Sequence, residues 1–274
     1  MWDSWFGHQL INKINTEFSM SFQKTILALT LSAAFGAMAQ TAPAAPESSL
    51  TYNLGVFSEY RYRGIAQTAK KPAVQGGFDY ADKSGAYVGV WASNISWIKD
   101  SDPKGNAKGP IEIDVYGGYK GNLSDAVAYD VGGLQYYYAG NTLNTVPGAV
   151  NANTFELYLA LSSGPFAAKV SNSMTNLFGA YNSKNSRYLD LSYTLDLGNG
   201  LTVVPHLGDQ YVANNATSYS DYSVAVNKDL DGTVISATVL GTNYKNRHGD
   251  YVLPGTGTKE LSGSALVLGL KKNF

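Results

Sequence analysis

The chain has 274 residues, of which only 15% are charged, against about 25% in an average soluble protein. The mean hydropathy of −0.16 shows that long apolar blocks do not replace the charge, and the chain is instead rich in glycine (29) and tyrosine (20), which favours thin-walled β-structure over a helical core. A net charge of −1 argues against a nucleic-acid partner, and the absence of cysteine excludes disulfides and thiolate metal sites.

The N-terminal region has the features of a secretory signal. A short basic segment beginning at Met20 precedes an apolar stretch that ends in an A-x-A cleavage pattern at Ala39. The stretch is too short for a membrane-spanning helix, which takes about 20 residues. We therefore expect residues 1–39 to be the signal-peptide region, with Met20 as the true initiator and cleavage after Ala39. Residues 1–19 would then lie before the true start, and residues 40–49 would form a flexible lead-in. A buried N-terminal helix is the alternative.

Apolar and polar residues alternate with a period of two throughout the rest of the chain, which is the pattern of half-buried β-strands. In the first segment one face carries Leu50, Tyr52, Leu54, Val56, Tyr60 and Tyr62. No segment after the signal is long and apolar enough to predict a spanning helix. The strands expected in chain order are 50–62, 73–81, 86–95, 111–120, 126–138, 154–161, 165–172, 188–195, 201–210, 219–228, 233–242 and 264–274.

The connections between these strands are short and long in turn. The short ones, such as 82–85 and 229–232, carry glycine with Asp, as hairpin turns require. Strict alternation over an even number of strands is typical of outer-membrane barrels, which have short periplasmic turns and long extracellular loops. We therefore predict an all-β protein in which residues 50–274 form a single antiparallel transmembrane β-barrel of about 12 strands in the bacterial outer membrane. A soluble β-sandwich is the alternative.

The last expected strand ends on Phe274, the final residue of the chain. Outer-membrane barrels characteristically end on an aromatic residue that the barrel-assembly machinery recognises. We therefore expect Phe274 to be an assembly signal and the machinery to be a partner, together with outer-membrane lipid and lipopolysaccharide.

Several stretches resemble the TorF-type family of proteobacterial porins, formerly a domain of unknown function. The matching runs are 55–67 (GVFSEYRYRGIAQ), 72–80, 85–94, 112–119 and 129–138. They cover the first half of the mature chain densely, and the second half matches mainly in spacing. Glu59 stands where the family pattern has Asp. The resemblance implies an outer-membrane location and a channel function, and it names no substrate.

Twelve strands about 4.8 Å apart and tilted by about 40° give roughly 24 Å between opposite backbones, of which inward side chains leave about 12–14 Å. Such a bore is wider than a barrel filled by its own side chains and narrower than a general porin. The candidate pore-lining residues, which share inward parity, are Glu59, Arg61, Arg63, Asp79, Glu112, Asp114, Lys120, Asp130, Glu156, Lys169, Asp190 and His206.

Some of these charges form two groups if both termini are periplasmic. Arg61 and Arg63 would then lie near the outer end of the first strand. The carboxylates expected near the outer ends of the fourth and sixth strands are Glu112, Asp114 and Glu156. A basic arc facing an acidic arc across the bore would order water and sort small solutes. The alternative is that these groups pair with one another and plug the lumen.

We therefore expect a porin-like channel for passive diffusion of small hydrophilic solutes or ions, with no cofactor, no catalytic residue and no bound metal. Asp100, Asp102 and Asn106 lack the regular spacing of a calcium loop. The second candidate function is a non-conducting barrel that acts as an adhesin, receptor or anchor. The third is a hydrolase centred on His206, with Ser192 or Asp190 as its partner. The oligomeric state is left open.

Overall fold

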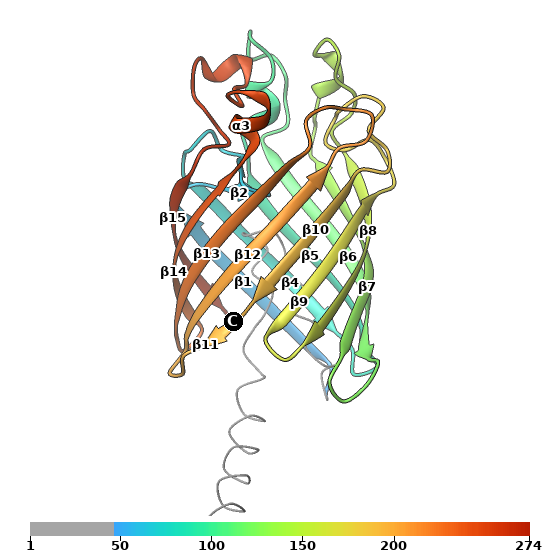
Figure 1. The fold of residues 1–274 in the computed structure, drawn as a ribbon, viewed down its shortest axis with the longest axis vertical. Helices are drawn as coiled ribbons and strands as arrows, with labels where there is room; N and C mark the ends of the chain where they lie inside the picture. Colours follow the sequence, from blue (N-terminus) through green and yellow to red (C-terminus); the bar gives the residue numbers. More distant parts are fainter. Residues whose placement is uncertain (1–46) are drawn as a thin grey trace, which may run out of the picture. The chain divides into compact units, whose positions relative to one another are not determined.

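The computed structural model describes residues 47–274, which form a closed antiparallel β-barrel (Figure 1). Successive wall strands pair with each other, and the first, β1 (Ser49–Phe57), pairs with the last, β15 (Ala265–Asn273), to close the wall. The other wall strands are β4 (Ala73–Ala81), β5 (Ala86–Asn94), β6 (Ile111–Asn122), β7 (Ala128–Tyr138), β8 (Thr154–Ser163), β9 (Phe166–Ser173), β10 (Arg187–Tyr193), β12 (Leu201–Tyr211), β13 (Tyr219–Leu230) and β14 (Thr233–Thr242). The two-residue β11 (Leu195–Asp196) continues β10 along β12, so the barrel has twelve strands as predicted.

The connections also alternate as expected, with all the short turns at one end of the barrel and all the long loops at the other. We call these the short-turn end and the long-loop end, at the bottom and top of Figure 1. The long loops carry four short helices, α2 (Trp97–Asp100), η1 (Leu143–Thr145), α3 (Tyr244–His248) and η2 (Pro254–Thr256). Within residues 47–274 no helix is long and apolar enough to cross a membrane. The expected signal segment lies outside the described residues.

A two-residue turn between β13 and β14 illustrates how local sequence sets the register. Asp231 and Gly232 both have positive φ, 53° and 79°, as a type I′ hairpin turn requires. The Gly232 N–H donates to the Asp229 carboxylate at 2.8 Å, and Leu230 pairs with Thr233. Because this turn matches the twist of the strands it joins, Asp-Gly fixes the pairing of both strands.

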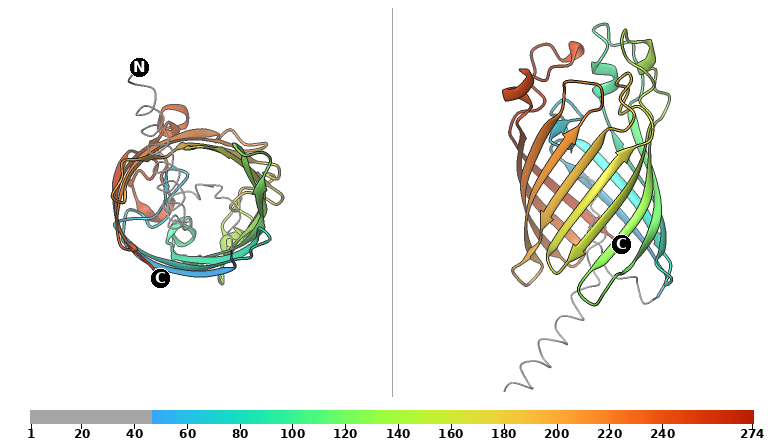
Figure 2. Two further views of the ribbon diagram at one scale, coloured as in Figure 1. Left: turned by 90° about the horizontal axis from the view of Figure 1, so that it is seen from below. Right: turned by 45° about the vertical axis from the view of Figure 1, so that its right-hand side comes forward.

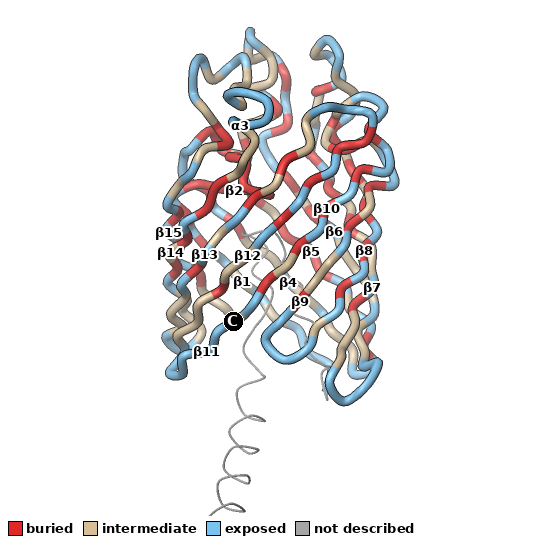
Figure 3. Tube along the Cα trace, viewed as in Figure 1, coloured by how far each residue is buried: buried red, intermediate tan, exposed pale blue. Residues whose placement is uncertain are grey.

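The two faces of each strand differ in the way that the alternation predicts (Figure 3). On β8 the outward Leu157 is 46% exposed, whereas its neighbour Glu156 is 2% exposed inside the barrel. Outward positions around the whole barrel carry Leu, Val, Ile and aromatic side chains. In hydrocarbon every backbone polar group needs an internal partner, and the closed sheet supplies one.

The first predicted strand is too long, and this is the main correction to the fold. The wall strand β1 ends at Phe57, and residues 58–72, the inward segment, fold into the lumen (Figure 2, left). The segment contains a small hairpin of β2 (Arg61–Tyr62) and β3 (Ile65–Ala66), turned at Arg63 and Gly64 with φ of 46° and 78°. The prediction that Tyr60 and Tyr62 face lipid was therefore wrong. Tyr60 is 2% exposed.

Candidate functional site in the barrel lumen

The structure places all twelve candidate pore-lining residues on the inside of the barrel, and they fall into two groups by their contacts. Those that meet at the inward segment, the constriction residues, are Glu59, Arg61, Arg63, Glu112, Asp114 and Glu156. The remaining candidates, the belt residues, line the wall outside the constriction: Asp79, Lys120, Asp130, Lys169, Asp190 and His206.

Arg61 holds the inward segment to the loop before β15. Its guanidinium pairs with Glu59 at 2.9 Å and donates to the carbonyl oxygen of Gly64 within the segment. It also donates to the carbonyl oxygens of Leu261 and Gly263, at 2.9 and 3.1 Å. The side chain is buried, so this arginine fastens the inward segment to the loop before β15.

Arg63 joins the inward segment to wall strands far from β1 in the barrel. It donates to both carboxylate oxygens of Glu156 on β8, at 3.0 and 2.8 Å, and to Oε1 of Gln210 on β12 at 2.6 Å. Its guanidinium lies 4.2 Å from the ring centroid of Tyr188 on β10. One member of each expected arc, Arg63 and Glu156, is thus in direct contact at this point.

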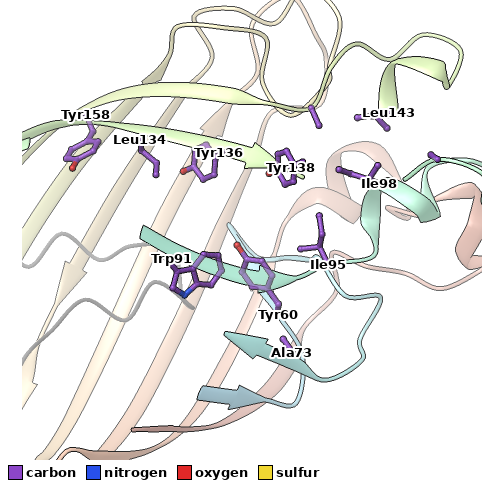
Figure 4. Packing of buried hydrophobic residues seen from close by; sticks show 12 residues of the cluster. Tyr60, Ala73, Trp91, Ile95, Ile98, Leu134, Tyr136, Tyr138, Leu143 and Tyr158 are labelled. Atoms are coloured by element: carbon purple, nitrogen blue, oxygen red, sulfur yellow. The ribbon is translucent and has the colours of Figure 1, made fainter. Parts of the chain in front are cut away.

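Glu112 is held by a tyrosine from the inward segment. The Tyr60 hydroxyl donates to Oε1 of Glu112 at 2.8 Å, and the Tyr60 ring packs edge-on against Trp91 with centroids 5.5 Å apart. Burial and the neighbouring Glu112 carboxylate raise the pKa of Tyr60, so its hydroxyl keeps the proton that it donates. Figure 4 shows the rings of Tyr60 and Trp91 in one row, with those of Tyr136 and Tyr138 in a second row.

Asp114 differs from the other constriction carboxylates because its Oδ1 has no hydrogen-bond partner among the described residues. The residue is 8% exposed and interacts electrostatically with Glu112 and Glu156. Along the strand pairing it lies between Trp91 on β5 and Tyr136 on β7. The carboxylate is therefore flanked by aromatic residues on both neighbouring strands.

Tyrosines of the inner wall lie flat over glycines of the adjacent strand. Tyr116 pairs directly with Gly89, where an added Cβ would come within 2.5 Å of the tyrosine ring. Lying across this glycine, the ring reaches Asp79 one strand further, to which its hydroxyl donates. The same arrangement recurs with Tyr87, Gly118 and Asp130, and with Tyr188, Gly208 and Asp221. The glycines therefore let large rings line the wall without projecting into the bore.

Two lysines complete the belt. The Lys120 ammonium is 3.9 Å from Asp130 and 4.6 Å from the ring centroid of Tyr87. Lys169 lies over the ring of Tyr158 at 4.2 Å and is paired across the strands with Asp190. Both cations thus sit over tyrosine rings, where the negative face of the ring attracts them.

His206 does not form the triad that a hydrolase would need. Its Nε2 is 3.4 Å from Asp190 and its Nδ1 is 3.7 Å from Asp221, so both ring nitrogens face carboxylates. In a Ser-His-Asp triad one nitrogen must receive the serine proton. Ser192 is the strand partner of His206, and no hydrogen bond joins their side chains among residues 47–274.

In the candidate calcium loop, backbone N–H groups already bond to the carboxylate of Asp102. Asp102 accepts from the backbone N–H groups of Lys104, Asn106 and Ala107, and these bonds lower the pKa of its carboxyl group. In the part of the chain that the structure describes, no group of three His, Asp or Glu residues is placed to hold a metal ion.

Comparison with known protein families shows to which family the chain belongs. The bacterial family described as "Bacterial protein of unknown function (Gcw_chp)" matches residues 40–274. The chain belongs to the Gcw_chp family. No curated protein matches the sequence.

Solved structures similar to this Gcw_chp barrel include the KdgM porin, at TM-score 0.49 and 7% identity, covering 83% of this chain and 99% of that one. The COG4313 outer membrane channel from Pseudomonas putida F1 has TM-score 0.49 and 9% identity, over 86% and 98% of the two chains. The NanC porin has TM-score 0.47 and 11% identity, over 82% and 99%.

The location of the Gcw_chp chain follows from its own surface. The protein is bacterial, its sheet is closed, and the outward side chains between the two ends form an apolar band. A closed antiparallel barrel of this kind, with an even number of strands and an apolar exterior, is the architecture that spans the bacterial outer membrane. The protein is an outer-membrane barrel.

The inward polar residues of this Gcw_chp barrel that were not among the predicted candidates include Gln75, Gln210, Asp221 and Lys271. Their parity within the expected strands was a usable signal. Asp221 alternates with the outward Tyr222 and Val224, and Lys271 follows the outward Leu270. What parity could not show is that Asp221 meets His206 and that Gln210 meets Arg63.

Proposed function

We propose that this protein is a narrow outer-membrane channel for small hydrophilic solutes or ions, constricted at its long-loop end by the inward segment. The observation that carries the proposal is the lining of the belt, where Asp, Lys, His and tyrosine hydroxyl groups face the lumen. Their rings lie flat on glycines, which keeps them against the wall. A polar lining on a barrel of twelve strands suits passage of hydrated solutes.

Three finer points belong to the same proposal. The long loops face the cell exterior and the short turns face the periplasm, as in other barrels of this architecture. The chain is of the TorF-type porin family that its runs at 55–67 and 129–138 resemble. Lipid and lipopolysaccharide surround the barrel, and the assembly machinery recognises Phe274.

A non-conducting anchor is the second candidate, and the constriction favours it. Arg61, Arg63, Glu112 and Glu156 are all buried. The Arg63–Glu156 salt bridge ties the inward segment to the wall, and Arg61 bonds it to the carbonyl oxygens of Leu261 and Gly263. If the segment filled the lumen completely, the barrel would present its loops and pass nothing.

Liposome swelling separates the two candidates. Vesicles containing the refolded mature protein are placed in isotonic solutions of neutral sugars of increasing size, beside vesicles without protein. The channel predicts swelling with the smallest sugars that falls steeply as the sugar grows. Swelling no faster than in the empty vesicles, from protein whose barrel shifts in electrophoresis on heating, would refute the channel and leave the anchor.

A further inference from the structure

The constriction residues do not balance in charge. Two arginines face four carboxylates, and each arginine is taken by one of them, Arg61 by Glu59 and Arg63 by Glu156. No ion pair to the remaining carboxylates, Glu112 and Asp114, is found among the described residues. Counted as formal charges, these six groups sum to −2, and the two carboxylates without an arginine partner lie on one strand, β6.

These two carboxylates are also held differently. Glu112 accepts a hydrogen bond from Tyr60, whereas Oδ1 of Asp114 has no partner within residues 47–274, although the residue is more than nine-tenths buried. Gln75 on β4 pairs with Ser93 on β5, which in turn pairs with Glu112 on β6. Gln75 is 3% exposed, and neither of its amide atoms has a partner in the described part of the chain. A carboxylate oxygen and an amide oxygen without donors on the inner wall are acceptors for a cation.

The aromatic residues around Asp114 and Glu112 also favour a cation over an anion at the constriction. Trp91 and Tyr136 flank Asp114 on the neighbouring strands, and Tyr60 covers Glu112 from the inward segment. The faces of aromatic rings carry negative potential and attract cations. An anion at the constriction would meet carboxylates and aromatic residues, because both guanidiniums already bond to other groups.

We infer that Asp114 and Glu112 make the constriction select small monovalent cations over anions, while the two arginines contribute little to selectivity. The inference rests on the proposed channel function. One unit charge about 4 Å from the ion path is worth about 1 kcal/mol even at the dielectric constant of water, which is about a fivefold change in local ion concentration. Neutralising Asp114 should therefore lower the ratio of potassium to chloride permeability by about fivefold or more.

The test is the reversal potential in planar bilayers under a potassium chloride gradient. The variants are Asp114→Asn and Glu112→Gln, which keep the shape of each side chain, and the double variant. The matched control is Asp79→Asn in the belt, where Lys120 and Lys271 lie near the carboxylate and offset it. We expect a cation-selective wild type, a large loss of selectivity in the constriction variants, and a smaller one in the control.

Several outcomes decide the matter. Selectivity differences that shrink at about 1 M salt, where the Debye length is about 3 Å, support fixed charges in the pore. A conducting wild type that prefers anions, or constriction variants no less selective than Asp79→Asn, would overturn the inference and leave the channel function standing. If Asp114→Asn does not assemble, Glu112→Gln carries the same comparison. A wild type that never conducts would overturn the inference together with the proposed function.

Discussion

Replacing Arg63 tests whether the inward segment is anchored to the far wall. The guanidinium makes three charge-assisted or polar hydrogen bonds, two to Glu156 and one to Gln210. In Arg63→Gln the Glu156 carboxylate would stay buried without its cation, and breaking a buried ion pair on one side costs about 3–5 kcal/mol. The loss in unfolding free energy would be smaller if the inward segment moved away from the wall, because water could then solvate Glu156.

What holds the rest of the segment decides how far it moves. Arg61 keeps its contacts with Leu261 and Gly263, and the apolar cluster of Ala66, Ala69 and Leu261 remains. We therefore expect Arg63→Gln to loosen the turn at Arg63 and Gly64 while the other half of the segment stays in place. Single-channel conductance should rise and become noisier, with the barrel strands intact.

The double variant Arg63→Gln/Glu156→Gln separates charge burial from lost contact. With both charges removed, no unpaired charge stays buried, so most of the loss in unfolding free energy should be recovered. Denaturant unfolding in detergent measures the loss, and bilayer recording measures the conductance. Arg187→Gln is the control, because Arg187 is exposed and its side chain makes one hydrogen bond among the described residues, 3.4 Å to Asn172. If Arg63→Gln matched wild type in both measurements, the proposed anchor would be refuted.

Three further predictions concern the barrel as a whole. Leu157→Arg on the lipid face should lower the unfolding free energy by about 2–4 kcal/mol near the membrane midplane, whereas the inward Asn227→Arg should change it little; equal losses in denaturant titrations would contradict the assigned faces. Deleting Phe274 should reduce the amount of protein in outer membranes and Phe274→Tyr should not, as quantified by immunoblotting of membrane fractions; equal levels of the deletion would exclude an assembly signal. N-terminal sequencing of the protein from membranes should begin within about two residues of Gln40, and an intact Met1 would contradict the predicted cleavage.

The barrel wall could be predicted from the sequence because its signals are local. Alternation with a period of two assigns each residue to a face, and turns such as Asp231-Gly232 fix where strands end. The same alternation led to the wrong prediction that Tyr60 and Tyr62 belong to the first wall strand, because a hairpin inside the lumen alternates with the same period as a wall strand. The local sign of the reversal was Arg63-Gly64, a less familiar pair for this turn than Asn-Gly or Asp-Gly.

The partners inside the lumen could not be predicted in the same way. Arg63 and Glu156 are 93 residues apart in the chain, and only the closed wall brings them together. The tyrosines that lie over glycines depend on the register of neighbouring strands, as with Tyr116 and Gly89. For the same reason parity identified Asp114 as inward but gave no sign that it would have no ion pair with another described residue.

The claim that the inward segment sets the width of a conducting pore is tested most directly by removing that segment. Phe57 and Ala73 are strand partners, so a short glycine-containing turn can join β1 to β4 in place of residues 58–72. Single-channel conductance of this variant is compared with wild type in planar bilayers. We predict small, well-defined steps for wild type and severalfold larger ones for the variant. Equal conductance, or silence of both assembled barrels, would contradict the account.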